Sequence, residues 1–295
     1  MVPDIDTFNN EGGVLRVIEA YHKHSVEFGI KYVGDGEEYD LLASHFGATG
    51  GNVDVAHLHG FVWGNNLSVD ELSVNRDIAE ACRNASEITV PSEWVAMTIK
   101  RDMRLSPHIV PHGIDVDDWT YSSKDESGGY VLWNKNRYDA VCNPTAVVKL
   151  AEAFPDHLFL TTFAPRNNLP NIKTIGLVNH NVMKPMIQNA GVYLSTVKET
   201  FGIGVLEAMA SRLPVLGWDI GGNKDLVIHG ETGYLARNGD YDDLREGLDY
   251  CLKYADILGE NAFEAVKKYT WESVMEKVHD VYTSAMQRVG RGALC

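Results

Sequence analysis

The sequence predicts an α/β protein with two parallel-sheet domains that face each other across a cleft. Short apolar runs rich in β-branched residues alternate with helical patterns along most of the chain, which is typical of parallel sheets covered by helices. A polar stretch rich in glycine and serine, residues 115–129, interrupts this alternation and predicts a linker. The length of 295 residues suits two domains of ordinary size.

The composition argues against several classes of function, namely binding to nucleic acid, to a membrane or to a metal through cysteines. Hydrophobic residues make up 44% of the chain and the net charge is −15, so no overall field favours nucleic acid or an anionic membrane. The four cysteines lack metal-ligand spacing and are expected to be reduced core thiols. We see neither a signal peptide nor an apolar run of the roughly 18 residues that a spanning helix needs. We therefore expect a soluble, cytoplasmic protein.

The first domain is predicted to cover residues 1–114. Gly12 and Gly13 precede a helix with apolar residues at helical spacing, and such a loop either approaches a phosphate or sugar or makes a plain tight turn. Residues 29–33 and 52–60 are interpreted as strands. His59 stands at the end of the second, where ligands gather in parallel sheets, although a lone histidine is equally often structural.

The rest of this domain continues the alternation. Residues 69–84 are predicted to be a helix, residues 86–91 a strand, and residues 92–103 a helix capped by Ser92. The basic cluster Lys100, Arg101 and Arg104 on this last helix suits a solvated face, or contact with an anionic acceptor or membrane surface.

The second domain is predicted to cover residues 130–270, and the C-terminal segment, residues 271–295, is expected to cross back to the first domain as a helix. We expect strands and helices to alternate here too. The predicted strands are residues 130–133, 158–163, 172–176, 191–195, 214–218 and a hairpin-like 231–235, and the predicted helices are residues 144–153, 181–188, 203–212, 242–254, 259–268 and 271–288.

The stretch from residue 199 to 214 contains the groups that most clearly indicate a binding site. Glu199 precedes a helix, and Glu207 lies inside it, past Gly202 and Gly204. Free N–H groups at a helix N-terminus bind phosphate, and carboxylates accept hydrogen bonds from hydroxyls. Phosphate flanked by hydroxyl-rich groups describes a nucleotide sugar, whereas the plainer alternative is a solvated helix with two surface glutamates.

Seven segments occur in a fixed order along the chain. They are Gly12-Gly13-Val14, Asp54-Val55-Ala56-His57-Leu58-His59, Val90-Pro91-Ser92-Glu93, Val110-Pro111-His112-Gly113-Ile114-Asp115, residues 199–214, Gly221-Gly222-Asn223-Lys224-Asp225-Leu226-Val227 and Gly230-Glu231-Thr232-Gly233-Tyr234-Leu235. In this order they resemble the family 4 retaining glycosyltransferases of the GT-B fold, which have two Rossmann-like domains. The resemblance spans about residues 10–285.

The resemblance implies transfer of a sugar from a nucleotide donor to an acceptor hydroxyl, with no obligatory metal. It implies that Glu199 holds donor-sugar hydroxyls, that Glu207 holds the ribose hydroxyls, and that His59 lies against the sugar. The remaining donor-binding positions that it implies are Gly12, Gly13, Thr200, Phe201, Gly202 and Ile203, with the base near Val178.

The chain departs from the family pattern in two places. The usual basic pair that neutralises the diphosphate is replaced by Asn134-Lys135-Asn136-Arg137, so we assign Lys135 and Arg137 to that catalytic role. The first domain is shorter than usual, and acceptor recognition lies there in the family.

Several alternatives stay open. A UDP-sugar such as UDP-glucose is favoured over GDP- and ADP-sugars, and the acceptor is a glycan, a lipid or a small molecule. A modified base in viral DNA is an alternative acceptor, and a catalytically degenerate nucleotide-sugar-binding protein is an alternative function. Membrane contact is not supported by the net charge, and the sequence does not predict an oligomeric state.

Overall fold

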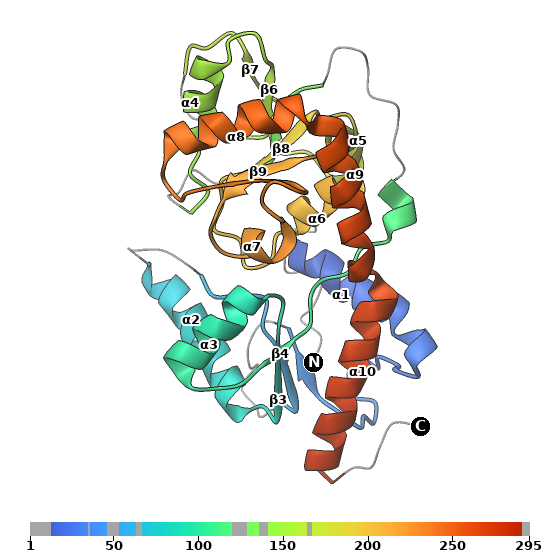
Figure 1. The fold of residues 1–295 in the computed structure, drawn as a ribbon. Helices are drawn as coiled ribbons and strands as arrows, with labels where there is room; N and C mark the ends of the chain where they lie inside the picture. The colour runs from blue at the N-terminus through green and yellow to red at the C-terminus, as the bar shows by residue number, and fades with distance from the viewer. Residues whose placement is uncertain are drawn as a thin grey trace. The chain divides into compact units, whose positions relative to one another are not determined.

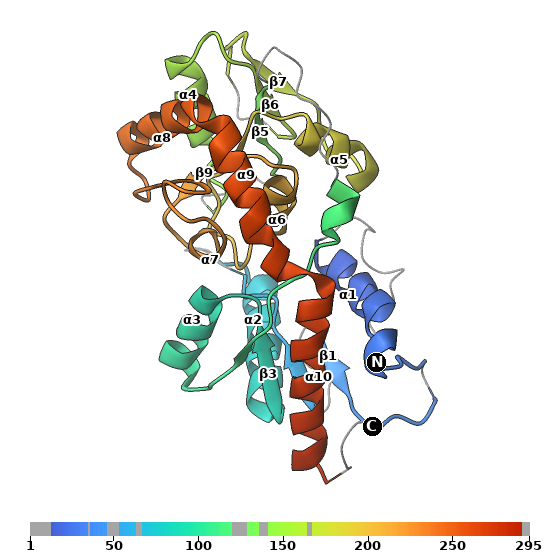
Figure 2. The same ribbon diagram turned by 45° about the vertical axis from the view of Figure 1, so that its right-hand side comes forward.

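The structure is a computed structural model that describes residues 13–34, 36–45, 53–62, 67–119, 129–135, 141–163 and 167–290. The chain divides into two compact units (Figures 1 and 2). Unit 1 comprises Met1–Gly113 and Tyr269–Cys295, and unit 2 comprises Ile114–Lys268. Each unit contains one sheet, and every strand pairing in the described residues is parallel, so the predicted α/β fold with two parallel-sheet domains is confirmed.

Unit 1 is built on a four-stranded sheet with the order β1-β2-β3-β4. Val55 pairs with Ala43 on one side and with Glu87 on the other, and Thr89 pairs with His108. Its elements are α1 (Gly13–His24), η2 (Val26–Phe28), β1 (Ala43–Ser44), β2 (Val55–His57), α2 (Val69–Asn84), β3 (Glu87–Val90), α3 (Glu93–Met103), β4 (His108–Ile109) and α10 (Trp271–Arg288).

The two faces of this sheet differ in chemistry because side chains alternate along a strand. Ile88 and Val90 of β3 face α2 and α3 in one apolar cluster. The intervening residues Glu87 and Thr89 point to the other face, where α10 contacts β2 and β3 and also packs on α1 (Figure 2). The polar face of the sheet is therefore covered by α1 and α10.

Unit 2 is built on a six-stranded sheet with the order β10-β9-β8-β5-β6-β7. The described elements are η3 (Val116–Trp119), β5 (Val131–Trp133), α4 (Thr145–Ala153), β6 (Phe159–Thr161), β7 (Ile172–Thr174), α5 (His180–Gln188), β8 (Val192–Ser195), α6 (Ile203–Ala210), β9 (Val215–Trp218), α7 (Asn223–Leu226), β10 (Gly233–Ala236), α8 (Tyr241–Lys253), α9 (Ala255–Val266) and η4 (Lys267–Tyr269).

Helices cover both faces of this sheet, and its central strands are buried throughout. Trp133 and Trp218 point to one face and pack with residues of α4 and α8. Tyr193 points to the other face, toward α6. Strands buried on both faces read as continuous apolar runs, which explains why the sequence pattern located them well.

Three sequence-based expectations about elements were wrong. Residues 29–33 form no strand, because Gly29 ends η2 with φ +70° and no described strand pairs with this stretch. The expected hairpin-like strand is β10, which pairs in parallel with β9, because the loop containing α7 returns the chain to the starting end of the sheet. The helix expected from residue 259 is α9, which already begins at Ala255.

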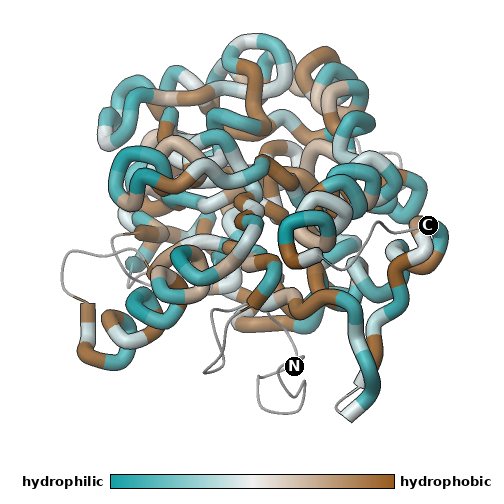
Figure 3. The backbone as a smooth tube through the Cα atoms, turned by 90° about the horizontal axis from the view of Figure 1, so that it is seen from below, coloured by the Kyte–Doolittle hydropathy of each residue, from teal (hydrophilic) through white to brown (hydrophobic). Residues whose placement is uncertain are grey.

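Hydrophobic and hydrophilic segments alternate in short stretches along the backbone in Figure 3. None of the helices in the described ranges is long and apolar enough to cross a membrane.

Candidate functional site

The candidate donor site lies at one edge of the unit 2 sheet. Lys135 follows β5, Glu199 follows β8, and Gly222 follows β9. These three strands are neighbours and run parallel, so the segments after them leave the sheet at the same edge. Ligands of open parallel sheets bind beyond the carboxyl ends of the strands. The topology therefore brings together residues that are far apart in the sequence.

Lys135 and Glu199 form an ion pair at this edge, with 2.7 Å between Nζ and Oε1. Burial alone favours the neutral amine, but the attraction of Glu199 and the hydrogen bonds to Glu199 and Tyr193 outweigh it and raise the pKa of Lys135. The lysine therefore stays cationic at neutral pH. Two residues predicted to hold the diphosphate and the sugar of a donor are thus in direct contact.

Tyr193 and Asn134 fix the position of the ammonium group. Lys135 Nζ donates to the Tyr193 hydroxyl over 3.3 Å, and that hydroxyl donates to Asn134 Oδ1 over 2.7 Å. Tyr193 is fully buried, and burial raises its pKa, so the hydroxyl keeps its proton and can donate. The lysine is therefore held by a hydrogen-bonded chain as well as by Glu199.

The segment between Glu199 and α6 is held by the loop after β9. Gly222 N–H donates to the Glu199 carbonyl over 2.8 Å, and a Cβ at Gly222 would lie 2.3 Å from the carbonyl oxygen of Phe201, so only glycine fits. Gly202 then caps α6 with φ +107°, a conformation that glycine adopts readily. α6 therefore begins four residues after Glu199, and N–H groups at a helix N-terminus suit a phosphate.

Glu207 lies inside α6 with a side chain only 7% exposed. Its Oε1 is 2.9 Å from Nε2 of His180, the first residue of α5. Val178, predicted to lie near the base, is two residues before His180 and is half-buried. The predicted ribose-binding carboxylate is therefore buried next to the loop predicted to receive the base.

In unit 1, His59 belongs to a cluster with His45, His57 and His112. Nδ1 of His45 lies 3.0 Å from Nε2 of His59, and the His45 ring stacks on His57 with 4.5 Å between centroids. The rings of His59 and His112 lie 5.3 Å apart. His59 is thus in the predicted place at the end of β2, but its neighbours are other histidines. Gly13 is the first residue of α1, whereas Gly12 and Arg137 lie outside the described residues.

His57 and His112 of this cluster are buried, whereas His45 and His59 are half-buried, and the surroundings of all four favour the neutral imidazole. Burial, with a contribution from neighbouring His59, lowers the pKa of His57 to about 3, and burial lowers that of His59 to about 4. His57 is further held by Thr89 Oγ1 at 2.7 Å and by the Tyr282 hydroxyl of α10 at 2.8 Å. Neutral imidazoles can donate and accept at once, which suits such a network.

Acidification is expected to destabilise unit 1. An unfolded imidazole binds its proton near pH 6.5, but folded His57 and His59 do so only near pH 3 and 4. Their contribution to stability is therefore complete above about pH 6.5 and falls by ~1.4 kcal/mol per pH unit for each histidine as the pH drops toward the folded pKa. Hydrogen exchange of the β2 amides between pH 7.5 and 4.5, corrected for intrinsic rates, measures this loss of stability.

A free energy of opening in β2 that does not change with pH would contradict the prediction. In the variant His57→Gln, the opening free energy is expected to depend less steeply on pH.

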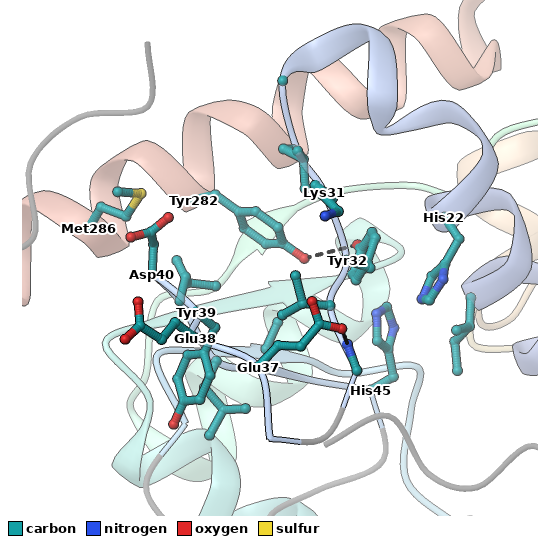
Figure 4. A pocket seen from close by; sticks show the side chains of 18 of the residues that line it. His22, Lys31, Tyr32, Glu37, Glu38, Tyr39, Asp40, His45, Tyr282 and Met286 are labelled. Atoms are coloured by element: carbon teal, nitrogen blue, oxygen red, sulfur yellow. Dashed lines mark hydrogen bonds between the residues drawn. The ribbon is translucent and has the colours of Figure 1, made fainter.

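Unit 1 also contains a cavity of about 370 Å³ (Figure 4). Its lining includes His22, Tyr282 and the exposed carboxylates of Glu37 and Glu38. His45 contributes to both this cavity and the histidine cluster. Among the described residues, the lining includes none of the predicted donor-binding residues.

The sequence analysis missed Tyr193, His180 and His45 as neighbours of predicted site residues. Tyr193 carried a usable signal, because a hydroxyl within a continuous apolar strand must find a hydrogen-bond partner. His180 and His45 carried none, because their contacts with Glu207 and His59 join segments 27 and 14 residues apart.

A protein family and several characterised or named proteins are similar in sequence to this chain. Residues 163–268 match the family described as glycosyl transferases group 1. An uncharacterized glycosyltransferase of Methanocaldococcus jannaschii is 23% identical over 95% of this chain and 83% of its own length. A phosphatidyl-myo-inositol mannosyltransferase of Mycobacterium leprae is 29% identical over 59% of this chain, and the match spans about half (52%) of that relative.

Similarity to solved structures concerns the fold. The Anabaena protein HepE, crystallised in complex with UDP-glucose, superposes with a TM-score of 0.65 at 17% identity, over 78% of this chain and 72% of that one. The solved structures similar to this chain are glycosyltransferases of the GT-B fold. The two parallel-sheet domains of this chain have that fold. The matched family region contains Glu199, α6 and Glu207, and Lys135 precedes it.

Proposed function

Because the chain carries a group 1 glycosyltransferase domain, we propose that it is a metal-independent, retaining glycosyltransferase of family 4. It moves a hexose-type sugar from a nucleotide diphosphate sugar to an acceptor hydroxyl. The observation that carries the proposal is the contact between Lys135 and Glu199, 2.7 Å apart, beside the N-terminus of α6. A cation, a helix N-terminus and a carboxylate at one sheet edge match a diphosphate followed by a sugar.

Each group has a role that its chemistry supports. The carboxylate of Glu199 accepts hydrogen bonds from the sugar hydroxyls, and that of Glu207 accepts them from the ribose. Lys135 and the first N–H groups of α6 bind the diphosphate, with Arg137 as a further cation. Glu199 compensates the charge of Lys135 through their direct contact.

The reaction follows from these roles. The bond between the anomeric carbon and the diphosphate oxygen breaks, and the acceptor oxygen forms a bond to that carbon on the same face. The acceptor proton passes to an oxygen of the departing diphosphate. Lys135 stabilises the negative charge that grows on this leaving group, which is the electrostatic contribution expected to matter most. His59 of unit 1 is assigned to contact the sugar.

The favoured donor is a UDP-sugar such as UDP-glucose. This choice is supported by the fold shared with HepE, which was crystallised with UDP-glucose. The exposed, apolar Leu177 next to Val178 offers a surface for a base of any kind. The acceptor is a hydroxyl on a glycan, a lipid or a small molecule.

A thermal-shift screen against UDP-, GDP- and ADP-sugars tests the proposal. A ligand that binds only the folded protein stabilises it by ~2.7 kcal/mol at a concentration of 100 Kd, which raises the melting temperature by several degrees. We expect the largest shift with a UDP-sugar and none with the free sugar. The absence of a shift with every nucleotide sugar would contradict the proposed function. A shift without release or transfer of sugar would indicate a degenerate binding protein.

A further inference from the structure

His180 is a hydrogen-bond partner of the buried Glu207 carboxylate. A carboxylate that is 7% exposed inside a helix is costly to desolvate unless a donor faces it. Nε2 of His180 lies 2.9 Å from Oε1 of Glu207 and is placed to donate to it. This nitrogen donates whether the ring is protonated or is the neutral tautomer with its hydrogen on Nε2.

Other residues of unit 2 also position the His180 ring. The ring packs edge-on against buried Trp119 of η3, with 5.8 Å between centroids and an interplanar angle of 69°. Lys184, one turn further along α5, places Nζ 5.2 Å from the centroid of Trp119. Asn179 caps α5 by accepting a hydrogen bond from Val182 N–H, which fixes the start of the helix at His180. Trp119 of η3 and the capped start of α5 therefore help determine where the imidazole lies.

We propose that His180 is a positioning residue that orients the Glu207 carboxylate for ribose recognition, and that this pair makes the site prefer ribonucleotides to 2′-deoxyribonucleotides. The inference rests on the proposed function. With one oxygen held by His180, the carboxylate is fixed in rotation, and its remaining lone pairs point in set directions. A fixed acceptor favours binding of a ligand that has a hydroxyl at one particular place. A ligand without that hydroxyl binds more weakly, because it leaves a buried hydrogen-bond acceptor unsatisfied.

The test compares UDP, GDP and ADP, each with its 2′-deoxy analogue, by isothermal titration calorimetry. The wild-type protein is expected to bind the best ribonucleotide at least 10-fold more tightly than its deoxy analogue. His180→Phe keeps an aromatic ring against Trp119 but removes the donor, and it should reduce the preference to 3-fold or less. The deoxy analogue and inorganic pyrophosphate should bind both proteins equally, which a general loss of folding would not produce.

Two further variants complete the experiment. His180→Gln retains an N–H donor on the side chain and should restore at least part of the ribose preference. Asn181→Ala, at the exposed next residue of α5, should leave all affinities unchanged. A full ribose preference in His180→Phe, or no preference in the wild type, would overturn the inference alone. Failure of the wild type to bind any of the nucleotides would overturn the proposed function and the inference with it.

Discussion

Replacing Glu199 by glutamine is expected to lower kcat/KM for the donor about 100- to 1,000-fold, the range for removing one transition-state contact. The amide has nearly the same shape, so the loop after β8 should keep its structure. It has no negative charge, so it holds Lys135 and the sugar hydroxyls less strongly than the carboxylate does. Steady-state kinetics with donor and acceptor, and donor hydrolysis without acceptor, measure the effect.

Glu152→Gln provides the matched control, because Glu152 is exposed on α4 and belongs to none of the site contacts described above. This control should retain wild-type kinetics. Activity within threefold of wild type in Glu199→Gln would remove Glu199 from the catalytic site.

Replacing Lys135 by methionine is expected to have a similarly large effect, a loss of about 100- to 1,000-fold in kcat/KM, because the departing diphosphate loses its buried cation. Methionine keeps much of the length of the side chain. Affinity for inorganic pyrophosphate should fall as well, which separates this variant from Glu199→Gln. Calorimetry with pyrophosphate and steady-state kinetics measure the two effects.

The exposed lysine of β7 gives the control variant, Lys173→Met, which should behave like wild type. The double variant of Lys135 and Glu199 should lose much less than the product of the single losses, because the two side chains contact each other and act together. Independent, multiplicative losses would contradict the shared role that the 2.7 Å contact indicates.

The fold was predictable wherever local pattern and tertiary environment agree. Buried parallel strands such as β8 and β9 show as continuous apolar runs. The last helix, expected at about residues 271–288, is α10 (Trp271–Arg288), whose amphipathic pattern starts after the Thr270 cap. Residues 29–33 have strand-like composition but no pairing partner among the described strands, and a sequence pattern cannot reveal a missing partner. The parallel pairing of β10 likewise depends on the path of the loop before it.

The candidate site, like the fold, could be predicted from the sequence only in part. Residues 199–207 could be predicted because a glycine loop, a helix start and two carboxylates occur within one short stretch. The contact between Lys135 and Glu199 spans 64 residues, and sheet topology alone produces it. The Glu207–His180 pair and the histidine cluster arise only from packing. Their chemistry, a buried charge with its donor and a set of neutral imidazoles, becomes visible once the chain has folded.

The central claim, that unit 2 binds a nucleotide sugar through Lys135, Glu199 and Glu207, is tested most directly by a crystal structure of the complex with UDP-glucose. We expect Nζ of Lys135 and the first N–H groups of α6 within hydrogen-bond distance of the diphosphate. We also expect the ribose hydroxyls on Glu207 and the sugar hydroxyls on Glu199. A nucleotide bound elsewhere, with the Lys135–Glu199 pair and α6 N-terminus free of ligand, would contradict the account.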